Sequence, residues 1–316
     1  MTTLRVLLHP GLLDSTELPP DLAGRVELVE IPGEGPLPDG LTAEALFTYN
    51  AGAANLADAL SRDVRWVHLY GTGLDRADLP TLTAGGRTVT NSSGAGAVPI
   101  SEWVLAVMLA EAKQLPESWG EPGDGRAWGG PYGLRGLHGK RLGLIGLGGI
   151  GQAVAVRALA FGMEVRALRR TGGPSPVPGV EVVGSLEQVL DGADHVVVTA
   201  PLTPATRGLL DARAFGAMKP GVHLVNIARG AIVDQEALRA ALDDGTVARA
   251  SLDVVHPEPL PSGHWLWSHP SVRLSAHVSW EWEQARTTAA EIFFANLRRR
   301  LAGEPLRHVI DGAEGY

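Results

Sequence analysis

Cysteine is absent from the 316-residue sequence, which excludes a disulfide framework and any zinc site built on thiolates. No apolar run reaches the length needed to span a membrane. The opening stretch, MTTLRVLLHPGLL, has too short an apolar run for a signal peptide, and no small-residue cleavage site follows it. We therefore expect a cytoplasmic protein with neither a membrane partner nor a metal centre.

Basic residues are fewer than acidic ones, with 27 Lys and Arg against 35 Asp and Glu, and the formal net charge is −8. This balance argues against general binding to nucleic acid or to an anionic membrane. The one basic cluster, Arg298–Arg300, is interpreted as the solvated last turn of a helix, where cations suit the dipole. The sequence lacks internal repeats, and 45% hydrophobic residues over this length predict two folded domains.

The first part of the chain alternates short β-rich segments with helical ones, which predicts a parallel sheet covered on both faces. A longer helix is predicted at 98–115, where apolar residues recur at spacings of three and four. Because this helix is apolar on most of its surface, we expect it to be buried, with Glu102 and Trp103 in packing roles. The strands expected before it are 5–9, 26–31, 45–50 and 64–70, with a helix at 56–63.

The same alternation restarts after a Gly- and Pro-rich segment at 116–133, which we interpret as a loop. The fold class predicted is therefore α/β, with two Rossmann-like doubly wound parallel-sheet domains. Residues 1–99 and 283–316 would form a flavodoxin-like substrate domain, and 100–282 a dinucleotide-binding domain, with the tail 304–316 returning to the first. The later strands expected are 141–146, 164–168, 194–200, 222–228, 248–255 and 272–277, and the helices are 150–162, 185–193, 235–245 and 282–303.

A dinucleotide-binding signature stands between a predicted strand and a predicted helix, in the sequence LGLIGLGGIG. Gly146 permits a tight turn, Gly148 lets the backbone approach a pyrophosphate, and Gly151 lets the helix pack against the strand. Free N–H groups at the helix N-terminus, with Gly149 and Ile150 in the first turn, would hold the anion. The alternative is a glycine-rich turn that binds no ligand.

Such a signature normally leads to an Asp or Glu about 20 residues further on, which holds the ribose hydroxyls of NAD. Here Arg169 takes that place, with Arg170 beside it. A guanidinium cannot accept a hydrogen bond, but it forms forked pairs with a phosphate such as the 2′-phosphate of NADP. One such bond contributes roughly 1.5–3 kcal/mol, so we predict NADP(H) as the preferred cofactor and NAD(H) as the second choice. The alternative is that both arginines are solvated loop residues and that cofactor choice is loose.

Three side chains that can bind an anion or transfer a proton each lie near the end of a predicted strand of the second domain: Arg229, Glu258 and His277. In open α/β sheets, ligands bind outside the carboxyl ends of the strands. We therefore expect these side chains to converge at that edge. Taken singly, His277 could be a structural histidine, Arg229 an ion-pair partner and Glu258 an exposed loop carboxylate.

Several stretches make the sequence resemble the D-isomer-specific 2-hydroxyacid dehydrogenases, and they stand in that family's order over most of 140–282. The resemblance is weaker near the N-terminus, in GTGLDRADL (71–79) and VTNSSGAGAVPISEW (89–103). It implies two Rossmann-like domains with the active site in the cleft, and a homodimer. Besides the glycine motif, the matching stretches are PLTPATRGLL (201–210), NIARGAIVD (226–234), LDVVHPEPLP (252–261) and AHVS (276–279).

The chemistry implied by this resemblance suits the residue types. Arg229 can bind the carboxylate of a 2-keto acid, helped by backbone N–H groups near Gly73 and Leu74. His277 can donate the proton that the carbonyl oxygen needs, because an imidazole changes its charge near neutral pH. Glu258 would pair with His277 and stabilise its protonated form.

The remaining site residues follow from the resemblance. Asp253 resembles the family residue that binds the nicotinamide amide, although a structural role is the alternative. Trp280 either lines the substrate pocket or packs in the core or between subunits. The other cofactor-binding residues predicted are Pro201, Thr206, Ile227 and Ala228.

We therefore interpret the sequence as an NADP(H)-preferring reductase of small 2-keto acids, similar to the glyoxylate and hydroxypyruvate reductases. Two departures from the family pattern are Arg169, in place of an acid, and His256, where an acidic residue is common. No regulatory extension follows the last helix, which argues against the long phosphoglycerate dehydrogenases, and Glu258 argues against formate dehydrogenase. The alternatives are a nucleotide-sensing scaffold like the C-terminal binding protein corepressors, or a dehydrogenase of another small acid such as 3-phosphoglycerate or phosphite.

Overall fold

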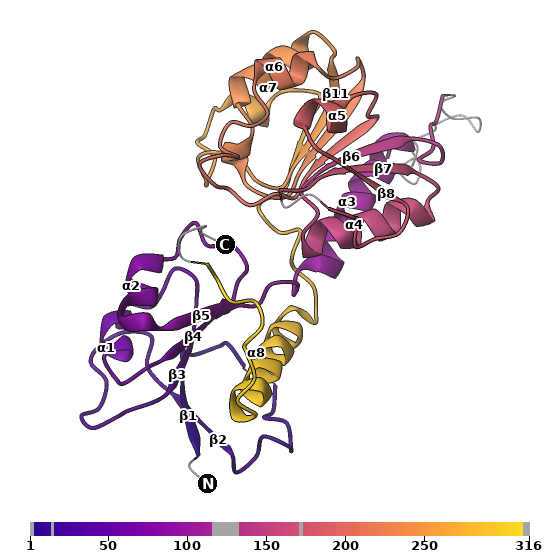
Figure 1. The fold of residues 1–316 in the computed structure, drawn as a ribbon. Helices are drawn as coiled ribbons and strands as arrows, with labels where there is room; N and C mark the ends of the chain where they lie inside the picture. The colour runs from indigo at the N-terminus through magenta and orange to yellow at the C-terminus, as the bar shows by residue number, and fades with distance from the viewer. Residues whose placement is uncertain (1–2, 14–15, 116–132, 171–172, 312–316) are drawn as a thin grey trace, which may run out of the picture. The chain divides into compact units, whose positions relative to one another are not determined.

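The computed structural model describes residues 3–13, 16–115, 133–170 and 173–311. The chain divides into two compact units, Met1–Gly96 with Trp282–Tyr316 and Ala97–Glu281. Each unit is built on one sheet of parallel strands with helices on both faces (Figure 1). The α/β class with two doubly wound parallel sheets is therefore confirmed. The loop predicted at 116–133 lies outside the described residues except for Gly133.

The sheet of the first unit has five strands in the order β2-β1-β3-β4-β5. Adjacent strands pair in parallel throughout, and an order that begins 2-1-3 is that of a doubly wound fold. β5 was not predicted, because it is short and three of its four residues, TVTN, are polar. The strands are β1 Leu4–Leu8, β2 Val26–Glu30, β3 Ala45–Thr48, β4 Trp66–Leu69 and β5 Thr88–Asn91.

Side chains that alternate along these strands feed two separate cores, as expected for a sheet covered on both faces. Phe47 and Trp66 pack with Phe293 of α8 (Ala285–Leu301). Leu46 and Val67 pack on the other face, beside α1 (Leu56–Leu60) and α2 (Leu79–Thr83), which leads into the 3-10 turn η1 (Ala84–Gly86). After α8 the chain returns along β5, where the Ile310 N–H donates to the Val89 carbonyl at 2.8 Å. The predicted return of the tail is therefore observed up to residue 311.

The sheet of the second unit has seven parallel strands in the order β12-β11-β10-β9-β6-β7-β8. The strand order reverses between β6 and β9, and this switch point is where ligands bind in open α/β sheets. The short edge strand β8 was not predicted. The strands are β6 Arg141–Ile145, β7 Glu164–Leu168, β8 Val180–Val183, β9 His195–Val198, β10 Val222–Asn226, β11 Val247–Leu252 and β12 Val272–Leu274.

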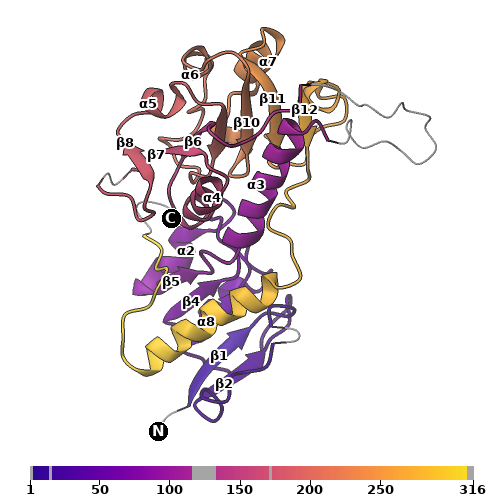
Figure 2. The same cartoon turned by 90° about the vertical axis from the view of Figure 1, so that its right-hand side faces the viewer.

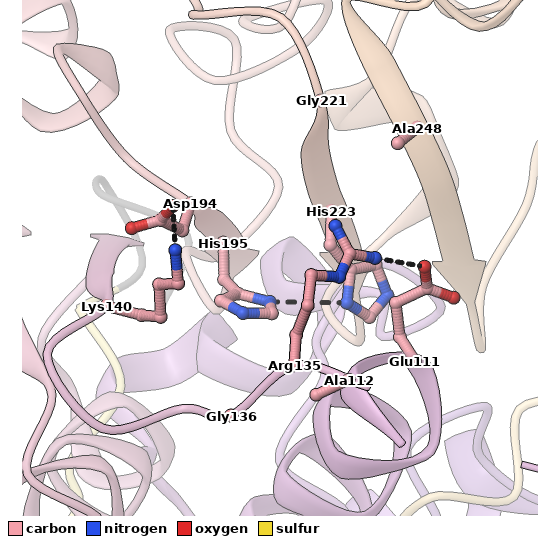
Figure 3. A pocket seen from close by; sticks show the side chains of 10 residues that line it. All are labelled: Glu111, Ala112, Arg135, Gly136, Lys140, Asp194, His195, Gly221, His223 and Ala248. Atoms are coloured by element: carbon pink, nitrogen blue, oxygen red, sulfur yellow. Dashed lines mark hydrogen bonds and ion pairs between the residues drawn. The ribbon is translucent and has the colours of Figure 1, made fainter. Parts of the chain in front are cut away.

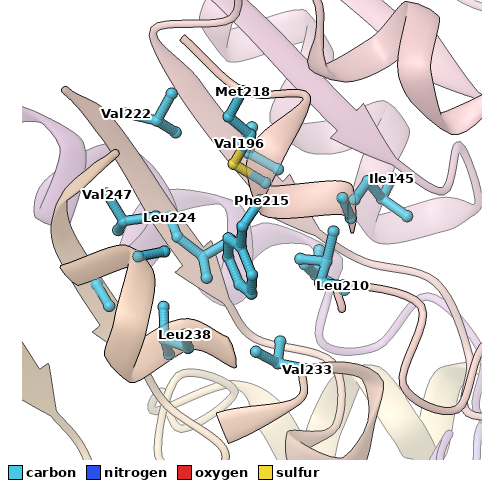
Figure 4. Close-up of a cluster of buried hydrophobic side chains, with 14 of the residues drawn as sticks. Ile145, Val196, Leu210, Phe215, Met218, Val222, Leu224, Val233, Leu238 and Val247 are labelled. Atoms are coloured by element: carbon cyan, nitrogen blue, oxygen red, sulfur yellow. The ribbon is translucent and has the colours of Figure 1, made fainter. Parts of the chain in front are cut away.

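Helices cover both faces of this second sheet (Figures 1 and 2). Val197 and Val225 face α3 and α4, whereas Val196 and Leu224 face α5, α6 and α7. Phe215 lies among aliphatic side chains in the latter core (Figure 4), and burial of such a side chain contributes about 1.5–3 kcal/mol. The helices are α3 Ala97–Ala112, α4 Gly149–Ala160, α5 Leu186–Leu190, α6 Ala212–Gly216 and α7 Gln235–Asp243, with 3-10 turns η2 Gly230–Ile232 and η3 Trp265–Trp267.

Several strands of the second sheet end earlier than the sequence predicted, and two of them, β10 and β12, end where the candidate site is built. β10 ends at Asn226 rather than at 228, because the Asn226 side chain bonds to the backbone of the next residues. β12 ends at Leu274 rather than at 277, where the chain turns into the loop that carries His277. None of the helices in the described ranges combines the length and the apolar character that a membrane-spanning segment needs.

Candidate active site

The glycine motif forms the turn between β6 and α4, and two of its three glycines are required by close backbone packing. Gly146 has a φ of +106°, and a Cβ there would lie 2.8 Å from the Ala200 nitrogen. A Cβ at Gly151 would lie 2.4 Å from the Gly146 carbonyl oxygen. Both distances are below any normal contact, so the fold of the turn itself demands glycine at these positions.

Gly148 differs from the other two, because a Cβ there would meet no atom within 4 Å. It is the N-cap of α4, and no side chain caps that helix end. The first N–H groups of a helix have no intrahelical partner, and together with the helix dipole they attract anions. The turn therefore fits the pyrophosphate of a dinucleotide, with Gly149 and Ile150 in the first turn of the helix.

The loops that follow β6 and β9 are joined at the switch point of the sheet. The Thr199 hydroxyl donates to the Gly146 carbonyl at 2.8 Å. Beyond it, residues 201–206 close a turn in which the Thr206 hydroxyl donates to the Pro201 carbonyl at 2.7 Å. Pro201 and Thr206, both predicted to bind cofactor, thus belong to one compact turn beside the glycine loop.

Arg169 follows β7, the strand next to β6. The glycine loop and the end of β7 are bonded to each other, because the Gly146 N–H donates to the Leu168 carbonyl at 3.0 Å. Arg169 is partly exposed, and its Nη1 donates to the Pro174 carbonyl at 3.3 Å, while Arg170 is exposed. Two guanidinium groups therefore stand where a dinucleotide fold normally presents a carboxylate.

Arg229 lies in the turn after β10, which Asn226 shapes. The Asn226 Oδ1 accepts the Ala228 N–H at 3.0 Å, and its Nδ2 donates to the Arg229 carbonyl at 3.0 Å. Gly230 packs so closely against the next loop that a Cβ would lie 2.0 Å from the Val255 carbonyl carbon. Arg229 is partly exposed and its Nη1 donates to the Ala228 carbonyl, whereas Ile227 and Ala228 are buried.

His277 and Glu258 come together as the sequence predicted. Nδ1 of His277 lies 3.0 Å from Oε2 of Glu258, and Oε1 of Glu258 accepts the Val255 N–H at 3.0 Å. The two side chains are 39% and 25% exposed. Since the carboxylate engages Nδ1, the second ring nitrogen, Nε2, is the atom that can exchange a proton with a ligand.

The backbone of His277 is held in an unusual conformation, with a φ of +57°. Its carbonyl accepts the indole N–H of Trp280 at 3.0 Å, and Trp280 itself is 40% exposed. The His277 N–H donates to the Asp253 carbonyl at 2.9 Å. Asp253 is 1% exposed, and its carboxylate bonds to residues 275–279 rather than facing solvent.

In the first unit, the loop predicted to assist carboxylate binding follows β4. Asn50 holds it, because its Nδ2 donates to the carbonyls of Gly71 and Gly73 and its Oδ1 accepts the Gly71 N–H. Gly73 and Leu74 are partly buried. The second unit by itself gathers Arg229, Asp253, Glu258, His277 and Trp280 at one edge of its sheet.

Asn226, Ser275 and Asn50 hold these loops, and the sequence interpretation did not single them out. Asn226 is the last residue of β10 and bonds to the backbone of residues 228 and 229, a local habit of Asn that the sequence does carry. The contacts of Asn50 with Gly71 and Gly73 and those of Ser275 depend on the fold and have no such signal.

A second polar cluster lies at the amino ends of the same strands and encloses a pocket of about 40 Å³ (Figure 3). There His195 Nδ1 lies 3.3 Å from His223 Nδ1, and His223 Nε2 lies 2.9 Å from the Ser251 hydroxyl. Burial lowers the pKa of His195 to about 4 and that of His223 well below its usual value. We call this the amino-edge pocket; its lining is Glu111, Ala112, Arg135, Gly136, Lys140, Asp194, His195, Gly221, His223 and Ala248.

Charged groups around the amino-edge pocket pair with one another. Glu111 bonds to Arg135 and Arg249 at 3.1 and 2.8 Å. Burial acts to raise the pKa of Asp194, but the Lys219 ammonium at 2.8 Å and the Arg141 N–H hold that pKa below its ordinary value. Among the described residues, no group of three or more His, Asp or Glu side chains is arranged to hold a metal ion.

A parallel sheet of this order, with a glycine-rich turn at its switch point, defines a dinucleotide-binding α/β protein. A family model for the NAD-binding domain of the D-isomer-specific 2-hydroxyacid dehydrogenases matches residues 105–279, more than half of the chain. The chain therefore belongs to that family, whose members act on CH–OH groups with a nicotinamide cofactor. The family predicted from the sequence is confirmed.

Individual relatives agree with the family model. A glyoxylate reductase of Thermofilum pendens is 34% identical over 264 residues, which are 79% of this chain and 76% of that protein. A D-3-phosphoglycerate dehydrogenase of Methanocaldococcus jannaschii is 31% identical over 304 residues, but this match spans only 57% of its length. The crystal structure of a D-isomer-specific 2-hydroxyacid dehydrogenase from Xanthobacter autotrophicus Py2, in complex with NADPH and MES, aligns with a TM-score of 0.80 and 28% identity over 100% of both chains.

Proposed function

We propose that this protein is an NADP(H)-preferring reductase of small 2-keto acids, of the glyoxylate and hydroxypyruvate reductase type. The glycine turn of residues 146–151 would hold the pyrophosphate of the cofactor on the N-terminus of α4. The turn at 201–206 and the buried residues Ile227 and Ala228 would flank it. When bound, the cofactor supplies the hydride.

The proton would come from His277. Glu258 engages Nδ1 at 3.0 Å, which fixes the ring plane and leaves Nε2 as the atom that delivers a proton to the carbonyl oxygen. In the reverse direction the same nitrogen would take the hydroxyl proton, and Glu258 would stabilise the resulting imidazolium. General acid–base catalysis of this kind supplies about 10²–10⁴ in rate.

Arg229 would bind the carboxylate of the substrate. It lies after β10, braced by Asn226 and by the contact of Gly230 with Val255. Because Val255 also donates to Glu258, the arginine loop and the His277–Glu258 pair share one support. Backbone N–H groups near Gly73 and Leu74 would add to carboxylate binding, and Trp280 would line the substrate pocket.

Arg169 and Arg170 support the cofactor preference. Both follow β7 at the edge where the glycine loop lies, and a forked guanidinium–phosphate pair suits the 2′-phosphate of NADP. A homodimer and a cytoplasmic location remain predictions from the sequence.

The observation that carries this proposal is the His277–Glu258 pair, held on a sheet edge that also presents Arg229 and a glycine turn. A scaffold that only sensed nucleotide would need the glycine turn alone. The His277–Glu258 pair, in which the histidine side chain is 39% exposed, is suited to proton exchange with a ligand. Because one relative is a D-3-phosphoglycerate dehydrogenase, 3-phosphoglycerate is the competing candidate substrate.

The test is the absorbance of reduced nicotinamide. Purified protein would be mixed with NADPH or NADH and, in turn, glyoxylate, hydroxypyruvate, pyruvate and a bulkier aromatic keto acid. The reverse reaction would be followed with NADP⁺ or NAD⁺ and 3-phosphoglycerate or phosphite. We expect faster oxidation of NADPH than NADH by a small keto acid. Tight cofactor binding without turnover would support the scaffold, and reduction of NAD(P)⁺ by phosphite or 3-phosphoglycerate alone would replace the proposed substrate class.

A further inference from the structure

The loop that carries His277 is tied to one buried carboxylate. Oδ1 of Asp253 accepts the Ser275 hydroxyl at 2.5 Å and the Val278 N–H at 3.0 Å, and Oδ2 accepts the Ser279 N–H at 3.0 Å. The Asp253 carbonyl accepts the His277 N–H at 2.9 Å. We name these four bonds the Asp253 clasp; they surround His277 on both sides in sequence.

The clasp holds a conformation that His277 would not adopt by itself. A φ of +57° is in the left-handed region, which is unfavourable for a non-glycine residue and persists only where the surroundings enforce it. Hydrogen bonds to an ionised carboxylate are among the stronger ones in proteins. Asp253 is also 1% exposed, so the protein itself fills the surroundings of this carboxylate.

Asn226, on the neighbouring strand β10, also holds a loop of the candidate site by side-chain hydrogen bonds. The Asp253 N–H donates to the Asn226 carbonyl at 3.0 Å, so the two residues are bonded where β10 and β11 end. The Asn226 side chain braces Ala228 and Arg229, while the Asp253 side chain braces the His277 loop. One pair of residues therefore fixes both loops of the candidate site.

We propose that Asp253 is a positioning residue, whose carboxylate holds residues 275–279 so that His277 presents Nε2 in one orientation, and that Asn226 fixes the Arg229 loop against it. This inference rests on the proposed function in taking His277 as the proton donor. It concerns the loop that carries His277, while the nicotinamide contact of Asp253 stays a separate prediction from the sequence.

The test compares Asp253→Asn with Asp211→Asn. The substituted side chain has an NH₂ donor in place of one acceptor oxygen. At least one hydrogen bond of the clasp must therefore be lost. Asp211 also accepts a backbone N–H, from Ala214, but at the start of α6, where Asn caps equally well. We expect hydrogen exchange of the Val278 and Ser279 amides to accelerate at least about tenfold in Asp253→Asn, with no change in Asp211→Asn.

Kinetics then separate positioning from cofactor contact. In Asp253→Asn, kcat should fall about 10- to 100-fold, with unchanged affinity for 2′-phospho-ADP-ribose, which lacks nicotinamide. The double variant Asp253→Asn/His277→Gln should be no slower than His277→Gln, because both changes act through one histidine. Weaker binding of NADPH but not of 2′-phospho-ADP-ribose, with normal amide protection, would instead establish the nicotinamide role and overturn the proposal.

Ser275→Ala covers the case in which Asp253→Asn does not fold. It removes one donor and leaves the carboxylate, so we expect Val278 and Ser279 to exchange several-fold faster and kcat to fall about two- to tenfold. Unchanged exchange and unchanged kcat would contradict the clasp. Hydrogen exchange needs no substrate, so it tests the clasp independently of activity. If the protein reduced no keto acid, the proposed function would be refuted, but the exchange rates of Val278 and Ser279 would still show whether the clasp holds the loop.

Discussion

The two edges of the second sheet contain similar residues and use them differently. At the carboxyl edge, His277 is paired with Glu258 and remains 39% exposed. At the amino edge, His195 and His223 are 8% and 3% exposed and bond to each other. Burial lowers the pKa of His195 to about 4, so this pair is neutral at physiological pH and belongs to the core.

The comparison shows that a histidine near carboxylates and arginines does not by itself make a site. What distinguishes His277 is a partly exposed side chain on a backbone that several bonds hold in one conformation. The charged groups of the amino-edge pocket satisfy one another, as Glu111 does with Arg135 and Arg249.

The largest effect should come from substituting His277, with the same substitution at His195 for comparison. His277→Gln should lower kcat about 10²–10⁴-fold, because Gln cannot deliver a proton, while cofactor affinity stays the same. His195→Gln should lower the melting temperature and leave kcat unchanged. Steady-state kinetics and thermal unfolding of both variants measure this; equal kcat losses would erase the proposed difference between the edges.

Arg229→Lys should raise KM for the keto acid about 10- to 100-fold. Lysine keeps the charge but loses the second arm of the forked pair with a carboxylate. Arg213→Lys, an exposed arginine paired with Glu187, is the matched control and should behave as wild type. A wild-type KM in Arg229→Lys would mean that the substrate carboxylate is held elsewhere.

Arg169→Asp should move the NADPH/NADH ratio of kcat/KM toward NADH by about 10- to 100-fold. A carboxylate accepts ribose hydroxyls and repels the 2′-phosphate. Arg166→Lys provides the control, because Arg166 lies on the same strand but pairs with Glu181 at 2.8 Å. If the ratio does not move in Arg169→Asp, Arg169 has no part in cofactor choice.

The glycine turn offers a contrast between packing and ligand approach. Gly151→Ala should lower the free energy of unfolding by about 1–3 kcal/mol, since its Cβ would lie 2.4 Å from a backbone oxygen. Gly148→Ala should leave the melting temperature unchanged, because its Cβ meets nothing within 4 Å, and should weaken cofactor binding about tenfold or more. Calorimetry of unfolding and of NADPH binding checks both, and tight binding to Gly148→Ala would argue against a pyrophosphate there.

The amino edge should make the protein acid-sensitive. The folded-state pKa of His195 is about 4, below the ordinary value of 6.5, so the unfolded chain binds more protons between these values. Stability from this group is complete above pH 6.5, is lost as the pH falls toward 4, and levels off below. Between pH 7 and 5.5 the free energy of unfolding should fall by about 1–2 kcal/mol. His195→Gln should show a shallower pH dependence, and an identical slope would show that other groups cause it.

The sequence predicted the class of fold and the family because those depend on local patterns. Strand–helix alternation and the glycine turn are such patterns, and the pairing of Glu258 with His277 is present at 3.0 Å. The strands β5 and β8 were not predicted because each has only four residues, too few for a pattern to stand out, and gains its order from the neighbouring strand. The contacts of Asp253 and Ser275 could not be predicted, since they join residues 22 or more positions apart through the fold.

We propose that the carboxyl edge of the second sheet binds the cofactor and that its amino edge does not. Hydrogen exchange of the wild-type protein with and without saturating NADPH tests this without relying on turnover. We expect protection in 146–151, 199–206 and 227–230 and no change in 136–141, 194–196 and 221–223. Protection confined to the amino-edge pocket, or no protection despite measured binding, would show that the cofactor does not bind at the carboxyl edge.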